Sequence, residues 1–252
     1  MKLKNFYFIS LIIFIGSCNL LNPGKKDLKN NSIQAKKDIE IRKKYDDNGK
    51  LVTTVPYKEG NIKHGIAKHY YPDGTVSMEI PYVNNKKHGE SVYYYTSGKV
   101  YRITPYINDK KHGIQKKYYE DDKLMAEIPF KNDEPVPGLK EYTEFGELLT
   151  QYPSIVFEEV NKVAFENKVI LKIYLSDKSK KVDFFRKTIN SEKDTIRLPI
   201  VDEGGIVEIE FYIPPGKMIM EKIDIVAVKT TRRNNQYVVE SSYNLAVENR
   251  LL

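Results

Sequence analysis

The chain has little of what most enzymes and disulfide-stabilised proteins use. Its 252 residues contain one cysteine, four histidines and no tryptophan. One cysteine cannot form a disulfide within the chain, so packing and sheet pairing must stabilise the fold. Residues 150–252 contain neither histidine nor cysteine. This excludes a Ser-His-Asp triad, a Cys-His pair and the common zinc sites from that part of the chain.

Other catalytic signatures are also missing from the sequence. No glycine-rich phosphate loop, dinucleotide fingerprint or kinase motif set is present. The sequence contains two pairs of adjacent carboxylates. Glu158-Glu159 lies in an alternating run, and Asp202-Glu203 comes just before a Gly-Gly turn. Neighbouring strand positions point to opposite faces, so we expect solvated charges rather than a glycosidase pair. The sequence therefore predicts a protein that is not an enzyme and that holds no cofactor or metal.

Long apolar runs are scarce, and the main one is short. Residues 6–15 are almost wholly apolar and follow Lys2 and Lys4. A membrane-spanning helix needs about 20 such residues. A short apolar run behind a basic start, followed by small residues, is typical of a secretory signal peptide.

The segment that ends this run is "IGSC", residues 15–18. It resembles the lipobox of bacterial lipoproteins. In that family the cysteine thiol is alkylated with diacylglycerol, the preceding peptide is removed and the new amino terminus is usually acylated. The resemblance implies a signal peptide at 1–17, a lipid on Cys18 and a location in the cell envelope, at the outer membrane if the cell has one. The alternative is an ordinary secretory signal in which this cysteine is unmodified.

The positive charge is concentrated beside the expected anchor. Residues 19–44 carry eight basic and three acidic residues, a net charge of +5. By contrast, residues 45–149 carry 15 basic and 16 acidic residues, and residues 150–252 carry 16 basic and 15 acidic residues. A nucleic-acid-binding protein places its positive charge on folded domains, so we expect no nucleic-acid partner. Lysines in the tether at 18–37 would instead favour an anionic lipid surface.

The middle of the chain repeats with a period of 24 or 25 residues. Its units are "YDDNGKLVTTVPYKEGNIKHG" (45–65), "YPDGTVSMEIPYVNNKKHG" (71–89), "YTSGKVYRITPYINDKKHG" (95–113) and "YEDDKLMAEIPFKNDEPVPG" (119–138). A truncated copy follows at 142–149, and 38–44 forms the half-unit that opens the series. Apolar residues alternate between turns, as at Val76, Met78 and Ile80, which predicts half-buried strands. We therefore predict a meander of β-hairpins over residues 38–149.

These units resemble the MORN-variant repeat of bacterial proteins, often labelled "antitoxin" repeats. The shared pattern is an aromatic residue, a turn with Gly-Lys, a strand, a tyrosine and a closing x-Gly. The resemblance implies a scaffold, because such repeats serve many functions. The fourth unit departs from the pattern: Asp122 replaces the turn glycine and Pro137 replaces the histidine, so we expect a looser fit there.

Three of the four histidines, His64, His88 and His112, occupy one column of the repeat. Equivalent positions in successive hairpins lie roughly 9–10 Å apart. Zinc needs ligand nitrogens at about 2.0–2.1 Å, so these side chains cannot share one ion. We interpret the column as structural, covering the neighbouring glycine, with pH sensing or a partner contact as alternatives. His69 lies outside the column, and we expect it to be solvated.

Aromatic residues cluster on equivalent strands and suggest a binding strip. The candidate binding residues are Tyr93, Tyr94, Tyr95, Arg102, Tyr118 and Tyr119. The alternative is a set of structural cross-strand ladders. In the third unit the apolar column becomes Val100, Arg102 and Thr104, which either a bulge or a local polar pocket would explain.

From about residue 150 the period stops, and seven short alternating runs follow. They are "IVFEEV", "KVILKIYL", "KVDFFRKTI", "DTIRLPI", "GIVEIEFYI", "IMEKIDIVAVKT" and "QYVVESSYNLAV". Seven short strands separated by turn residues predict an immunoglobulin-like β-sandwich at 150–252. The fold class is therefore all-β: a MORN-like hairpin meander followed by a C-terminal β-sandwich.

Together these patterns favour a non-catalytic, lipid-anchored envelope protein that acts as a protein-binding or scaffolding module. Its expected partners are membrane lipid, through acylated Cys18, and a protein, with cell-wall glycan as the alternative ligand. The alternative function is an immunity or antitoxin-type protein that neutralises a toxin or an envelope enzyme.

Overall fold

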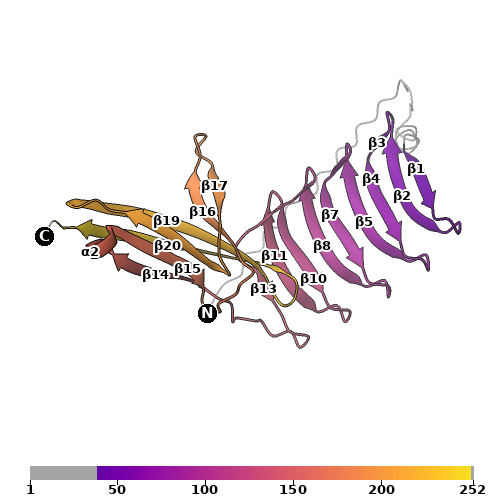
Figure 1. Ribbon diagram of the computed structural model, residues 1–252. Helices are drawn as coiled ribbons and strands as arrows, with labels where there is room; N and C mark the ends of the chain where they lie inside the picture. Colours follow the sequence, from indigo (N-terminus) through magenta and orange to yellow (C-terminus); the bar gives the residue numbers. More distant parts are fainter. Residues whose placement is uncertain (1–38, 251–252) are drawn as a thin grey trace, which may run out of the picture. The chain divides into compact units, whose positions relative to one another are not determined.

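Antiparallel β-sheets form nearly the whole of the structure, a computed structural model that describes residues 39–250 (Figure 1). The predicted signal peptide, Cys18 and the basic tether lie outside the described residues. The predicted all-β fold is confirmed. In the described part of the chain, no helix is long and apolar enough to cross a membrane.

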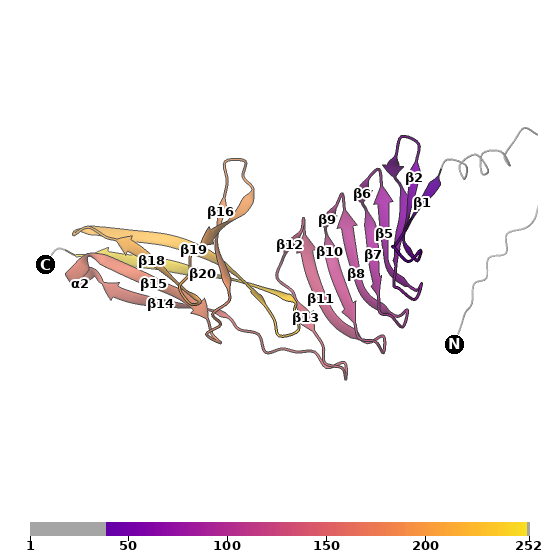
Figure 2. The same cartoon turned by 45° about the vertical axis from the view of Figure 1, so that its right-hand side comes forward.

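The repeats form one antiparallel sheet with the strand order β1-β2-β4-β5-β7-β8-β10-β11-β12. Figure 2 shows these hairpins stacked in chain order. The long strands are β1 (Glu40–Tyr45), β2 (Leu51–Lys58), β4 (Gly65–Tyr70), β5 (Val76–Val83), β7 (Gly89–Tyr94), β8 (Val100–Ile107), β10 (Gly113–Tyr118) and β11 (Leu124–Lys131). The short strands are β3 (Ile62–Lys63), β6 (Lys86–Lys87), β9 (Lys110–Lys111), β12 (Glu134–Pro135) and β13 (Lys140–Glu141). The predicted hairpin meander is confirmed.

The hairpin turns follow from the residues that tolerate positive φ. Asn84 and Asn85 have φ of 52° and 69°, and Asn108 and Asp109 have 50° and 71°. Two consecutive positive φ angles define the type I′ turn, whose twist matches that of the flanking strands. Asparagine and aspartate reach this region more easily than other residues with a Cβ.

The Lys-Lys-His-Gly segments mark a bend in the chain. In the second unit the backbone N–H of His88 donates to the Pro81 carbonyl, with an N–O distance of 3.1 Å. Gly89 then takes a φ of 105°, and a Cβ there would lie 3.3 Å from Cγ of the Pro81 ring. From this glycine onward the chain pairs with β8, and β7 also pairs with β5 at Val92 and Tyr93. The repeated histidine therefore contributes its backbone to a bend that needs glycine next.

Neighbouring units are joined by a repeated two-way clamp. The N–H of Asp109 donates to the Lys87 carbonyl at 2.9 Å, and the N–H of Lys87 donates to Oδ1 of Asp109 at 2.8 Å. The Lys87 ammonium lies 5.2 Å from the centroid of the Tyr106 ring. The same backbone clamp joins Asn85 to Lys63 and Asp133 to Lys111. Each unit thus stabilises the unit before it.

The fourth unit keeps the geometry of the others, contrary to the predicted looser fit. Asp122 has a φ of 67° and occupies the turn position of glycine. Val136, and not Pro137, takes the place of the histidine, because its N–H donates to the Pro129 carbonyl at 3.0 Å. Proline has no N–H and could not make this bond. Ala126 in this unit is fully buried.

Seven further strands form the C-terminal sandwich, and each predicted run is a strand. One sheet contains β14 (Ile155–Lys162), β15 (Lys168–Leu175) and β18 (Ile206–Tyr212). The other has the order β17-β16-β19-β20, with β16 (Asp183–Ile189), β17 (Thr195–Ile200), β19 (Lys217–Thr230) and β20 (Gln236–Asn249). This is the order of an immunoglobulin-like sandwich in which the fourth strand of the domain, β17, lies in the same sheet as the third, β16. A short helix, α2 (Val163–Glu166), was not predicted.

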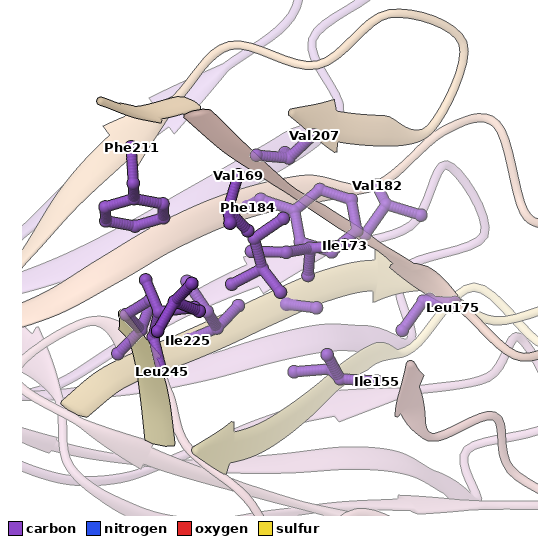
Figure 3. Packing of buried hydrophobic residues seen from close by; sticks show 14 of the residues in the cluster. Ile155, Val169, Ile173, Leu175, Val182, Phe184, Val207, Phe211, Ile225 and Leu245 are labelled. Carbon is purple, nitrogen blue, oxygen red and sulfur yellow. The ribbon is translucent and has the colours of Figure 1, made fainter. Parts of the chain in front are cut away.

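The main hydrophobic core lies between these two sheets (Figure 3). Alternating residues of β15, such as Val169, Leu171 and Ile173, are fully buried and face Phe184 and Ile225 of the other sheet. Burying one such side chain stabilises the fold by about 1.5–3 kcal/mol. This core needs no disulfide, as the cysteine count requires.

The β19–β20 hairpin also contacts the end of the repeat sheet. Tyr237 of β20 packs, together with Tyr152, against a small buried cluster that contains Ala126, Ile128 and Leu139. The rings of Tyr152 and Tyr237 stack at a centroid distance of 4.9 Å. The regions predicted at 38–149 and 150–252 are therefore in direct contact, which the sequence did not indicate.

Candidate functional site

One continuous row of side chains crosses a single face of the repeat sheet. Directly paired residues on neighbouring strands share a face, so the strand register defines the row. We name it the central row: Lys44, Thr53, His69, Met78, Tyr93, Arg102, Lys117, Ala126 and Glu141. Within residues 39–250 no second sheet covers this face, and the β19–β20 hairpin packs against its β10–β11 end.

The middle of this face is polar where its flanks are apolar. We name as the polar patch the residues Ser91, Tyr93, Arg102, Thr104, Gln115 and Lys117 of β7, β8 and β10. On either side, β5 presents Met78 and Ile80, and β11 presents Ala126 and Ile128. Ser91 and Thr104 are each only 1% exposed. The patch is therefore a buried polar insert in an apolar face.

The structure decides between the two explanations left open for the third unit. A register shift occurs at Tyr93/Tyr94, but the same shift occurs at His69/Tyr70 and at Lys117/Tyr118. The bulge is therefore a property of every hairpin. The polar patch is what distinguishes the third unit.

Two cations lie side by side in the patch. Arg102 pairs directly with Lys117 across the strands. The Arg102 guanidinium lies 4.0 Å from the centroid of the Tyr93 ring, and its buried Nε has no hydrogen-bond partner among the described residues. The Lys117 ammonium donates to the Asn234 carbonyl at 3.1 Å and to Oδ1 of Asn235 at 2.6 Å. Burial, followed by the nearby Arg102 charge, lowers the pKa of Lys117.

Glu141, at the end of the central row, is fully engaged by other donors. Its Oε1 accepts hydrogen bonds from Thr231 Oγ1 and Asn235 Nδ2, both at 2.6 Å. Its Oε2 accepts a bond from the Tyr152 hydroxyl at 3.1 Å. Burial, reinforced by the Glu141 charge, raises the pKa of Tyr152. We name Lys117, Glu141, Tyr152, Thr231 and Asn235 the junction cluster, since it joins the repeats to the sandwich.

A groove of about 550 Å³ opens beside the junction cluster. It is lined by Glu141, Leu148, Leu149, Thr150, Gln151, Tyr152, Pro153, Asp177, Lys229, Thr231, Arg232, Arg233 and Tyr237. Three of the charged side chains that line it already have partners. Lys229 and Asp177 form an ion pair at 2.7 Å, and Glu141 accepts hydrogen bonds within the junction cluster. Its walls therefore combine the linker after the repeats with the β19–β20 hairpin.

The six predicted binding residues do not form one strip. The hydroxyls of Tyr95 and Tyr119 donate to the carbonyls of Tyr118 and Tyr142 in the next unit, both at 2.8 Å. These two tyrosines thus form a structural ladder between units. The Tyr94 hydroxyl donates to Glu79, on the opposite face from the central row. Tyr93 and Arg102 are the two candidates that the structure brings into contact.

The histidines do not converge. The N–H groups of His64 and His112 bond to proline carbonyls at successive bends, as that of His88 does. Residues 39–250 contain no group of three or more His, Cys, Asp or Glu side chains placed to hold a metal. His69 was predicted to be solvated, which is wrong: it lies half-buried in the central row, 3.3 Å from Thr53 Oγ1, and burial lowers its pKa.

The sequence prediction missed Ser91, Gln115, Lys117, Glu141 and Asn235. A signal for part of this set was visible, because Arg102 and Thr104 interrupt an apolar column. Asn235 gives no such signal: it sits in a turn and is 94 residues from Glu141, yet it is only 2% exposed.

A family model described as the MORN repeat variant matches the chain at residues 41–59, 63–84, 87–108 and 111–132. The four matches coincide with the hairpins β1–β2, β4–β5, β7–β8 and β10–β11. A comparison with curated proteins gave no match. The predicted repeat resemblance is therefore confirmed over four successive hairpins.

Proposed function

We propose that this protein is a non-catalytic scaffold, held in the cell envelope by a lipid on Cys18, and that its repeat sheet binds a protein partner. The observation that supports this best is the polar patch, a cationic insert in which Tyr93 and Arg102 stay partly exposed, on a face that no second sheet of the described residues covers. Tyrosine and arginine, the residue types enriched at binding hot spots, meet there at Tyr93 and Arg102.

The junction cluster supports the same proposal. It joins strand β10 of the repeats to the β19–β20 hairpin through buried, charge-assisted hydrogen bonds. A surface that is ordered before binding loses less entropy when a partner docks. The sandwich would thus act as a fixed support for the repeat face.

A comparison of the wild-type chain with Cys18→Ala in the cells that make it tests the anchor. The wild type is expected in the membrane fraction, and the variant is expected in the soluble exported fraction. Metabolic labelling with a fatty-acid analogue should mark the wild type alone. Equal labelling and equal membrane recovery of both chains would show that Cys18 is not the anchor.

In-cell crosslinking of the same two chains tests the partner. The scaffold function predicts one protein captured at near-stoichiometric yield, and only by the anchored chain. If a toxin or an envelope enzyme is captured and its activity falls, the protein is an immunity protein instead. If only cell-wall glycan is recovered, the proposal of a protein partner is wrong.

A further inference from the structure

We propose that Arg102 and its neighbours in the polar patch form a receptor for a carboxylate side chain, presented by an acidic segment of the partner protein. This inference rests on the proposed function, because it names the chemistry of the partner that the repeat sheet would bind. Three observations support it: an unpartnered donor, an arginine without an acid partner and an apolar border.

The first observation is the Arg102 Nε, which is buried without an acceptor in the described structure. A buried donor left without a partner costs stability, so such a group calls for an explanation. The neighbouring Ser91 Oγ is also buried and unpartnered. The guanidinium face rests on the Tyr93 ring, which leaves the planar N–H edge to meet a ligand. An anionic group bound at that edge would satisfy it.

The second observation is that Arg102 forms no ion pair among the described residues, since Glu141, the acid on this face, acts on Lys117. Like charges directly opposite each other on paired strands destabilise a sheet, and Arg102 faces Lys117. Glu141 is already bonded to Thr231, Asn235 and Tyr152. The remaining acids of these strands point away.

Glu79 and Glu127 illustrate this. Both lie on the opposite face and pair there with Lys68 and Lys140. Among the described residues Arg102 therefore has no acid as a partner, whereas the charge of Glu141 favours the protonated form of Lys117.

The third observation indicates a carboxylate on a protein rather than a free anion. The patch is bordered by Met78 and Ile80 on the β5 side, whereas Ala126 and Ile128 on the β11 side are buried against Tyr152 and Tyr237. An apolar border beside a cation–aromatic centre can contact the methylene groups of an acidic side chain while its carboxylate binds the cation. The arginine fork also matches the two oxygens of a carboxylate.

Arg42 provides a matched control within the same sheet. Its guanidinium lies 4.3 Å from the centroid of the Tyr57 ring, which resembles the placement of Arg102 over Tyr93. Arg42 differs in having an acid of its own, since its Nε lies 3.0 Å from Glu40. Arg42 should therefore contribute nothing to carboxylate binding.

The experiment titrates the full chain, in detergent micelles, with a pentaglutamate peptide by isothermal calorimetry at low salt. The wild type should bind saturably, and added salt should weaken the binding. Arg102→Met should lower the affinity at least tenfold, about the value of one charge-assisted hydrogen-bonded contact. Arg42→Met should leave the affinity within about twofold of the wild type.

Folding is monitored by thermal unfolding, so a misfolded variant cannot be mistaken for a positive result. Methionine already occupies the equivalent position in the second unit, at Met78, so Arg102→Met should melt at or above the wild-type temperature. Arg102→Lys keeps the charge and loses the fork, and it should bind with intermediate affinity.

Two results would overturn the inference. One is pentaglutamate binding that is absent, or that is equal in the wild type and Arg102→Met. The other is inorganic phosphate binding as tightly as pentaglutamate and with the same dependence on Arg102, which would indicate a general anion site. Neither result bears on Cys18 or on crosslinking in cells, so the proposed function can stand or fall separately.

Discussion

The backbone of Gly113 lies against the ring of Pro105. A Cβ added to Gly113 would come within 3.2 Å of Cγ of that proline, and the φ of Gly113 is 106°. The same contact joins a closing glycine to the preceding proline in the other units, with a Cβ–Cγ distance of 3.1–3.4 Å. The proline and glycine columns of the sequence are therefore one packing interaction, repeated in each hairpin.

Gly113→Ala should destabilise the protein by roughly 2–4 kcal/mol, because it combines backbone strain with an overpacked contact. Equilibrium unfolding in urea measures the change. The control is Gly98→Ala, where φ is also positive, at 83°, but no atom lies within 4 Å of the added Cβ. It should cost about 1–2 kcal/mol. Equal losses in both variants would show that the Pro105 contact is unimportant.

Asn235→Ala should destabilise the junction cluster by about 2–4 kcal/mol. The change removes one of the two acceptors of Lys117 and a donor to Glu141, and it leaves both charges buried with fewer partners. Denaturant unfolding measures the total, and hydrogen exchange should show faster exchange in the β19–β20 turn. Asn244→Ala, at an exposed position of β20, is the control and should change stability by less than about 0.5 kcal/mol.

The lowered pKa of Lys117 predicts a pH dependence. The unfolded chain holds the Lys117 proton up to about pH 10.4, whereas the folded chain releases it at a lower pH. Between these two pKa values the unfolded state binds more protons, so raising the pH stabilises the folded state.

The tyrosines are the same in the wild type and in Lys117→Met, so their titration cancels in the difference between the two unfolding free energies. That difference therefore reports on Lys117. It should shift in favour of the wild type as the pH rises from 7 towards 10. A difference that is constant over this range would mean that the pKa of Lys117 is the same in both states.

Tyr95→Phe should cost about 0.5–1.5 kcal/mol, since it removes the hydroxyl that donates to the Tyr118 carbonyl at 2.8 Å. Thermal unfolding measures the loss. Tyr212→Phe, at a side chain that is 68% exposed, is the control and should be nearly silent. If Tyr95→Phe leaves stability unchanged but weakens partner capture, Tyr95 belongs to the binding surface and not to the ladder.

Local pattern was enough to predict most of the fold. Alternation in runs such as "KVILKIYL" predicted all seven sandwich strands, because successive strand residues point to opposite faces and one face is the more apolar. Positive-φ turns were visible at Asn84-Asn85 and Asn108-Asp109, since asparagine and aspartate tolerate that geometry. In the fourth unit, an inserted proline shifted the apparent register, and Val136 was missed as the bonded residue.

The candidate site was predictable only in part. Arg102 was visible because it interrupts an apolar column, and Tyr93 was visible as one of several tyrosines. Which face they share, and which of them touch, depends on pairing between strands. Asn235 and Glu141 meet through contacts between distant segments, and no local pattern marks either residue as buried.

Site-specific photocrosslinking in cells tests the central claim most directly. A photoreactive residue replaces Met78, on the face of the polar patch, or Lys116, on the opposite face. The account predicts that Met78 captures one protein, that Lys116 does not, and that Arg102→Met abolishes the capture. Equal capture from both faces would contradict the claim that this face of the repeat sheet binds the partner, and capture from Met78 that survives Arg102→Met would contradict the role of Arg102.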